Sequence, residues 1–139
     1  MRLNTILLVD DNPADNYIHR RILLRADCAE NIEVSLNGAE GVAYISQRIE
    51  QHQALPELIF LDINMPVLDG WGFLEEFRAL PLAAEDAPIV VMLTTSLHPR
   101  DVARARKSGM VAEYIDKPLT VETLETLLQR LFVDASRSG

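Results

Sequence analysis

Polar residues end several apolar runs in this sequence, and their types define the chemistry that the chain could perform. Four runs stop abruptly at carboxylates, hydroxyls or an ammonium group: 6–9 at Asp10-Asp11, 58–61 at Asp62, 89–93 at Thr94-Thr95-Ser96, and 111–115 at Asp116-Lys117. Short apolar runs between turn signals are typical of strands buried on both faces of a parallel sheet. If these strands are neighbours, their polar ends meet at one edge, where open α/β sheets bind ligands.

The acids Asp10, Asp11 and Asp62 predict a cation site. Carboxylates clustered in a partly buried cleft repel one another, and they need a cation or a proton. The pattern places no histidine or cysteine with them, and an all-oxygen ligand set suits Mg²⁺. The alternative is that Asp10 and Asp11 only cap the turn after the first strand, but a third acid on a neighbouring strand favours the cation.

Lys117 is expected to point across the same edge, because it follows an apolar run and precedes Pro118, which disfavours a helix at this point. The alternative is a solvated surface lysine. A cation, a lysine and the hydroxyl of Thr95 around one carboxylate are the groups that stabilise a phosphoryl group in transfer. Asp62 would then be the nucleophile and would form an acyl phosphate.

Helical segments separate the strands, and this alternation predicts the fold that positions the site. Five strand–helix units with short connections indicate a parallel sheet with helices on both faces. We expect a doubly wound, flavodoxin-like α/β fold with strand order 2-1-3-4-5, which brings Asp10 and Asp11 beside Asp62. The expected strands are 5–10, 32–36, 58–61, 89–94 and 111–116, and the expected helices are 13–27, 39–52, 71–80, 99–108 and 120–132.

Local signals mark several ends of these elements. Asn12 is expected to cap the first helix, with Asp15 reaching back to close a capping box. Gly109 is a natural C-cap of the fourth helix, and Gly70 is expected to supply an unusual backbone angle in the turn 66–70. The apolar positions predicted for the first helix are Tyr17, Ile18, Ile22 and Leu23, and the histidines predicted to be solvated are His19, His52 and His98.

The composition limits the class of protein. With 139 residues, 48% of them apolar, the chain is expected to form one domain over 1–133, followed by a disordered tail over 134–139. A net charge of −8 argues against direct DNA binding. No apolar stretch approaches the ~20 residues of a membrane span, and the N-terminus lacks the features of a signal peptide. The single cysteine, Cys28, excludes an internal disulfide, so a cytoplasmic protein is expected.

The pattern of these polar residues resembles the signature of a known family. Over essentially its whole length the chain is similar to the receiver domain of response regulators in two-component signalling, whose signature it matches at Asp10, Asp11, Asp62, Thr95 and Lys117-Pro118. The resemblance implies that Asp62 accepts a phosphoryl group from a phosphohistidine of a histidine kinase or a histidine phosphotransfer protein. In its loop lengths the chain is similar to a stand-alone subgroup that includes partners of bacterial phytochrome kinases.

The same resemblance implies the metal ligands. Mg²⁺ would be bound directly by Asp11 and Asp62 and by the backbone carbonyl of Asn64, whereas Asp10 would act mainly through water. Lys117 would pair first with Asp62 and then with the phosphoryl oxygens.

The resemblance also implies residues that respond to phosphorylation of Asp62. Thr95, with its neighbour Ser96, would contact the phosphoryl group, and Thr94 is the alternative for this role. Tyr114 matches the aromatic residue that turns inward as Thr95 moves; the alternative is that it only packs at the sheet edge. Leu97 stands where the family tunes the access of hydrolytic water, so we expect slow self-dephosphorylation.

Seven residues follow the fifth helix, which is too few for an output domain, so we expect the output to be a protein contact or a phosphorelay step. The fourth helix, fifth strand and fifth helix would form the contact surface, for an unknown downstream protein or for a homodimer. The apolar residues that could contribute there are Leu97, Val111, Leu124 and Leu131. We expect no enzymatic activity beyond the chain's own phosphotransfer and dephosphorylation.

Three other functions are alternatives for this sequence. The first is a binding module that does not depend on phosphorylation, against which the intact signature argues. The second is a flavodoxin-like electron carrier, but Asp10-Asp11-Asn12-Pro13 would repel the phosphate of its cofactor. The third, a haloacid-dehalogenase-type phosphatase, expects a second aspartate two residues after Asp62, where this chain has Asn64.

Overall fold

A five-stranded parallel sheet forms the centre of the computed structural model, which describes residues 2–96 and 98–133. Its strand order is β2-β1-β3-β4-β5, as the sequence predicts. Every pair of neighbouring strands is parallel. The strands are β1 (Leu3–Val9), β2 (Ala29–Ser35), β3 (Leu58–Leu61), β4 (Ile89–Thr94) and β5 (Val111–Asp116).

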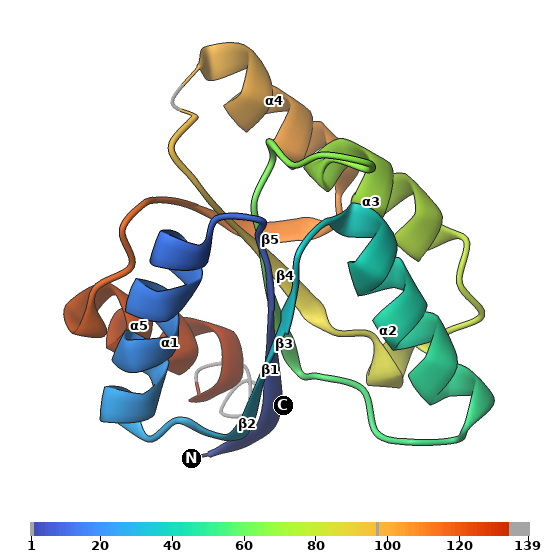
Figure 1. Ribbon diagram of the computed structural model, residues 1–139, viewed down its shortest axis with the longest axis horizontal. Coiled ribbons are helices and arrows are strands. Elements are labelled where there is room, and N and C mark those ends of the chain that lie inside the picture. Colours follow the sequence, from blue (N-terminus) through green and yellow to red (C-terminus); the bar gives the residue numbers. More distant parts are fainter. Residues whose placement is uncertain (1, 97, 134–139) are drawn as a thin grey trace.

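Helices cover both faces of this sheet (Figure 1). One face carries α1 and α5, and the other carries α2, α3 and α4. A 3₁₀ turn lies between α3 and β4, and a π-helical segment continues α5. The helices are α1 (Pro13–Ala26), α2 (Gly38–Glu50), α3 (Gly70–Arg78), α4 (Pro99–Ser108) and α5 (Val121–Leu128), and the two short segments are Ala84–Asp86 and Gln129–Val133.

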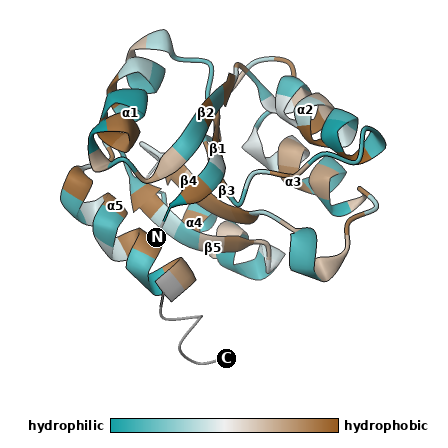
Figure 2. Ribbon diagram, turned by 90° about the horizontal axis from the view of Figure 1, so that it is seen from below, coloured by the Kyte–Doolittle hydropathy of each residue, from teal (hydrophilic) through white to brown (hydrophobic). Residues whose placement is uncertain are grey.

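The alternation of side chains along each strand builds two hydrophobic cores. In β1, Ile6 and Leu8 point towards α1 and α5, whereas Leu7 and Val9 point towards α2 and α3. All four side chains are buried, and each contributes about 1.5–3 kcal/mol by leaving water. The central strands β1, β3 and β4 therefore lie between the helices, which also carry many hydrophilic residues (Figure 2).

Two expectations are wrong in part: Leu23 is buried and Ile22 packs against the core as predicted for the first helix, but the other two apolar positions of that helix are exposed, and the bounds of β2 differ from the predicted strand. In α1, Tyr17 and Ile18 are 63% and 45% exposed, and the polar side chains Asn16 and His19 are buried instead. The helix faces the polar carboxyl end of β1, where Asn16 donates to the backbone carbonyl of Asp10 at 2.9 Å, so polar residues fit there. The edge strand β2 begins and ends earlier than predicted and leaves Leu36 exposed outside it.

The end signals of the helices are mostly confirmed. Asn12 caps α1 by accepting hydrogen bonds from the backbone N–H groups of Ala14 and Asp15 at 2.9 and 3.0 Å, and Gly109 adopts the left-handed C-cap with φ 68°. The expected backbone angle of Gly70 is wrong. The residue with positive φ in this turn is Val67, at 69°, where the N–H of Leu68 bonds back to the carbonyl of Pro66.

Among the described residues, no helix is long and apolar enough to cross a membrane. The predicted tail 134–139 lies outside those residues, as does Leu97.

Candidate functional site

Three acids meet at the carboxyl edge of the sheet, as the sequence predicts. Carboxylate oxygens of Asp10, Asp11 and Asp62 lie within 4.8 Å of one another. The adjacency of β1 and β3 brings them together, and the N–H of Asp62 bonds to the carbonyl of Val9 at 3.0 Å. Asp10 and Asp62 are buried, whereas Asp11 is exposed. This all-oxygen set, open on one side, fits a hydrated divalent cation such as Mg²⁺.

Lys117 reaches into this cluster and is not a surface lysine. Its Nζ lies 2.7 Å from Asp10 Oδ2 and 3.2 Å from Asp62 Oδ2, and its side chain is only 7% exposed. Because β5 lies beyond β4 from these acids, a long side chain is needed to reach them. The Lys117–Pro118 peptide is cis.

Each buried carboxylate divides its two oxygens between the backbone and the lysine. Asp10 Oδ1 accepts the N–H of Asn12 at 3.0 Å, and Asp62 Oδ1 accepts the N–H of Ile63 at 2.8 Å. Asp10 therefore does cap the turn after β1, but this uses only one of its two carboxylate oxygens. The second oxygen of each acid faces Lys117.

Burial and an excess of acidic groups shift the pKa values of the charged residues in the site. Burial alone would lower the pKa of Lys117, but its hydrogen bonds to Asp10 and Asp15 and its attraction to Asp10 and Asp62 outweigh burial and raise that pKa. Burial raises the pKa of Asp10, and the bonds from Lys117 and Asn12 offset this only in part. One ammonium group thus leaves the acids short of positive charge, which favours a further cation.

The residues after β4 are arranged around Ser96. Thr94 is fully buried and belongs to the core, whereas Thr95 is exposed. The hydroxyl of Ser96 donates to Asp101 Oδ2 at 2.5 Å, so it is occupied by α4. The hydroxyl of Tyr114 donates to the backbone carbonyl of Ser96 at 2.6 Å, which links β5 to the segment that follows β4.

Asp15 belongs to the site, although the sequence pattern does not predict it there. Its Oδ2 lies 2.7 Å from Nζ of Lys117, so Asp15 does not close the predicted capping box. The backbone N–H of Asn12, which a capping box would occupy, bonds to Asp10 instead. No signal in the sequence pairs residue 15 with a lysine 102 positions away.

His19, predicted to be solvated, is 2% exposed and lines a small cavity together with Asp10 and Asp62. Burial lowers its pKa, and the nearby charge of Lys117 lowers it further. Asn64 is exposed, two residues after Asp62.

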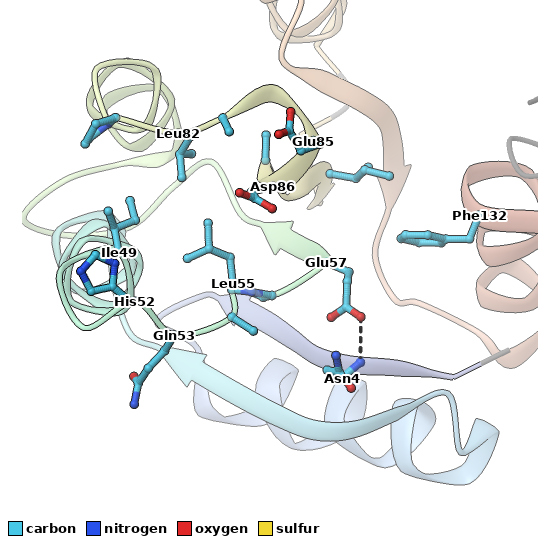
Figure 3. Close-up of a pocket in the computed structure, with 16 residues that line it drawn as sticks. Asn4, Ile49, His52, Gln53, Leu55, Glu57, Leu82, Glu85, Asp86 and Phe132 are labelled. Atoms are coloured by element: carbon cyan, nitrogen blue, oxygen red, sulfur yellow. Dashed lines mark hydrogen bonds between the residues drawn. The ribbon is translucent and has the colours of Figure 1, made fainter.

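A large pocket lies away from this site. It has a volume of about 690 Å³ and opens at the amino ends of the strands, between the loops that precede β3 and β4 (Figure 3). Glu57 is one of its acids, and its carboxylate accepts the N–H of Asn4 at 2.9 Å. That carboxylate is therefore used to hold β1 against the start of β3.

The chain was compared with known families and proteins. The family described as "Response regulator receiver domain" matches residues 6–129. Response regulator Rcp1 of Synechocystis sp. is 31% identical over 125 residues, which cover 89% of this chain and 83% of that protein.

Two solved structures have the same fold. The bacteriophytochrome response regulator AtBRR has a TM-score of 0.76 and 28% identity, covering 94% of both chains. The receiver domain of the sensor histidine kinase PA1611 from Pseudomonas aeruginosa, which holds a magnesium ion in its active-site cleft, has a TM-score of 0.73 and 25% identity, covering 91% of this chain and 95% of that one. The predicted family, fold and likeness to phytochrome-associated regulators are confirmed: the chain belongs to the response regulator receiver domain family of two-component signalling.

Proposed function

We propose that this protein is a phosphorylation switch in which Asp62 accepts a phosphoryl group from a phosphohistidine of a histidine kinase or a histidine phosphotransfer protein. A carboxylate oxygen of Asp62 attacks the phosphorus atom, the P–N bond of the donor breaks, and its electron pair returns to the imidazole. The product is an acyl phosphate on Asp62.

The position of Lys117 carries this proposal. Its ammonium group lies 3.2 Å from the oxygen of Asp62 that does not bond to the backbone. A buried cation beside the attacking oxygen is placed to stabilise the charge of a phosphoryl group in transfer. Thr95 is exposed at the end of β4, at the same edge of the sheet, and supplies a hydroxyl for the phosphoryl oxygens.

Asp11 and Asp62 would hold Mg²⁺ directly, with the backbone carbonyl of Asn64, and Asp10 would act through water. The cluster of carboxylates within 4.8 Å supports this assignment, as does the magnesium ion in the related receiver domain of PA1611. When bound, the ion neutralises the acids and the incoming phosphoryl group.

The output would pass through the surface formed by α4, β5 and α5. The hydrogen bond from Tyr114 to the carbonyl of Ser96 supports this route, because it couples β5 to the segment next to Thr95. Val111 in β5 and Leu131 in the segment that continues α5 are half-buried and could contact a downstream protein or a second copy. Leu124 is fully buried and is not available for such a contact.

We propose that the chain catalyses only its own phosphotransfer and dephosphorylation, and that it works in the cytoplasm. A buried, free Cys28 is compatible with a reducing compartment. The net charge of −8 supports a protein partner and not DNA.

The test is incubation with Mg²⁺ and either acetyl phosphate or phosphoramidate, a donor with a P–N bond, followed by intact mass. We expect a gain of roughly 80 Da for one phosphoryl group, which Asp62→Asn abolishes. Asp86→Asn is the matched control, because that exposed carboxylate lies at the opposite edge of the sheet.

A mass gain that survives in Asp62→Asn would refute the assignment of the acceptor. No gain in the wild type, with Mg²⁺ binding demonstrated by the fluorescence of Trp71, would favour the alternative of a phosphorylation-independent binding module. Trp71 is the single tryptophan, and it follows Gly70, which touches the backbone of Asp62.

A further inference from the structure

Lys117 has a partner that belongs to none of the roles proposed above. Its Nζ lies 2.7 Å from Asp15 Oδ2, as close as it lies to Asp10 and closer than the 3.2 Å to Asp62. A lysine ammonium has three N–H donors, so each of them faces one carboxylate. Of these three carboxylates, Asp10 and Asp62 belong to the cation cluster, and Asp15 does not.

The first turn of α1 holds Asp15 firmly in this place. Its backbone N–H donates to the side chain of Asn12 at 3.0 Å, and the side-chain amide of the following residue, Asn16, donates to the carbonyl of Asp10 at 2.9 Å. The Asn16 side chain thus ties this turn to the end of β1. The Asp15 side chain is 31% exposed, so its replacement leaves no cavity in the core.

An acid in the first turn of a helix is often only a favourable partner for the helix dipole, and α2 contains such a case. Glu40 holds the same position after its cap, Asn37, as Asp15 holds after Asn12. Its carboxylate reaches back to Asn37 Nδ2 and the N–H of Leu36 at 3.4 and 3.5 Å. Asp15 instead turns away from its own helix end towards the strand edge, which a dipole role does not require.

We infer that Asp15 is a positioning residue that holds the ammonium group of Lys117 against Asp62. This inference rests on the phosphoacceptor role proposed for Asp62. When Asp10 and Asp62 engage a cation and a phosphoryl group, Asp15 remains as the anchor of Lys117. Without Asp15, the only carboxylates left next to Lys117 are those of Asp10 and Asp62, which also belong to the cation cluster.

Transfer kinetics test this role through a double-mutant cycle. We expect Asp15→Ala to slow phosphoryl transfer from acetyl phosphate at saturating Mg²⁺ by about tenfold, and Asp15→Asn, which keeps an oxygen acceptor, by roughly threefold. In a Lys117→Met background, Asp15→Ala should have no further effect. Glu40→Gln, the matched loss of a first-turn charge, should leave the rate unchanged.

Acylation of lysine gives a second readout that needs neither Mg²⁺ nor a phosphodonor. The chain has only two lysines, and exposed Lys107 serves as the internal reference for buried Lys117. With N-hydroxysuccinimidyl acetate and peptide mass mapping, Asp15→Ala should raise the labelling of Lys117 relative to Lys107 severalfold, and Glu40→Gln should not.

An equal slowing by Asp15→Ala with and without Lys117, or an unchanged labelling ratio, would overturn the inference. A wild type that takes up no phosphoryl group would instead refute the proposed function, and the labelling ratio would still report whether Asp15 holds Lys117. Urea denaturation of each variant separates either result from a loss of folding.

Discussion

Gly70 is the position where a single methyl group should disturb the proposed phosphoacceptor without touching its side chain. A Cβ added at Gly70 would lie 2.4 Å from the carbonyl oxygen of Asp62 and 2.9 Å from Cα of Ile63. The first distance is about 1 Å short of ordinary van der Waals contact. Both neighbours are backbone atoms, and the N–H of Gly70 also bonds to the carbonyl of Ile63 at 2.8 Å, so relief requires the whole turn to move.

We expect Gly70→Ala to destabilise the fold by about 2 kcal/mol, the usual cost of overpacking a close contact. For a domain of this size, the melting temperature should fall by roughly 6–10 °C. Displacement of Asp62 by a fraction of an ångström should also slow its phosphorylation, by about tenfold, because the reacting atoms must be well aligned. Thermal unfolding and intact mass after acetyl phosphate measure the two effects.

Gly72 supplies the matched control two residues later in the same helix. Its added Cβ would lie 2.4 Å from Cδ1 of Leu68, the end of a flexible side chain that can rotate away. Alanine also has the better helix propensity, by about 1 kcal/mol. Gly72→Ala should therefore change stability little and leave phosphorylation intact. If Gly70→Ala behaves like Gly72→Ala in both assays, the steric argument is refuted.

Two further predictions concern stability. Burial lowers the pKa of His19 in the folded state below its ordinary 6.5, so the unfolded chain binds more protons and stability falls as the pH drops below about 6.5. His19→Gln should reduce this loss of unfolding free energy at low pH by up to ~1.4 kcal/mol per pH unit. Urea denaturation between about pH 5 and 6.5 measures it. His52→Gln, on an exposed loop, is the control and should leave the pH dependence unchanged. Asn37 caps α2 by accepting the N–H of Glu40 at 2.9 Å, so Asn37→Ala should cost about 1 kcal/mol in thermal unfolding, and an unchanged melting temperature would contradict this capping role.

Patterns that depend on neighbours along the chain were predictable from the sequence. Buried strands need continuous apolar runs, so the three central runs, 6–9, 58–61 and 89–93, and the polar residues after them predict the sheet and its reactive edge. The fourth run forms β5, which lies at the edge of the sheet and is only partly buried. Caps such as Asn12 and Gly109 act within one turn of the chain, so residue type and position suffice to predict them.

Only the tertiary structure decided features that depend on contacts distant in sequence. The carboxylate of Asp15 turns to Lys117, because folding brings together residues 102 positions apart. His19 is buried because α1 packs its polar side on the end of β1, which no apolar periodicity shows. Gly70 is required for a close approach to Asp62 and not for an unusual backbone angle, which Val67 adopts instead. Sequence by itself determined which polar groups follow the central strands, and packing decided which other residues join them and which groups touch, because contact requires the relative placement of whole elements.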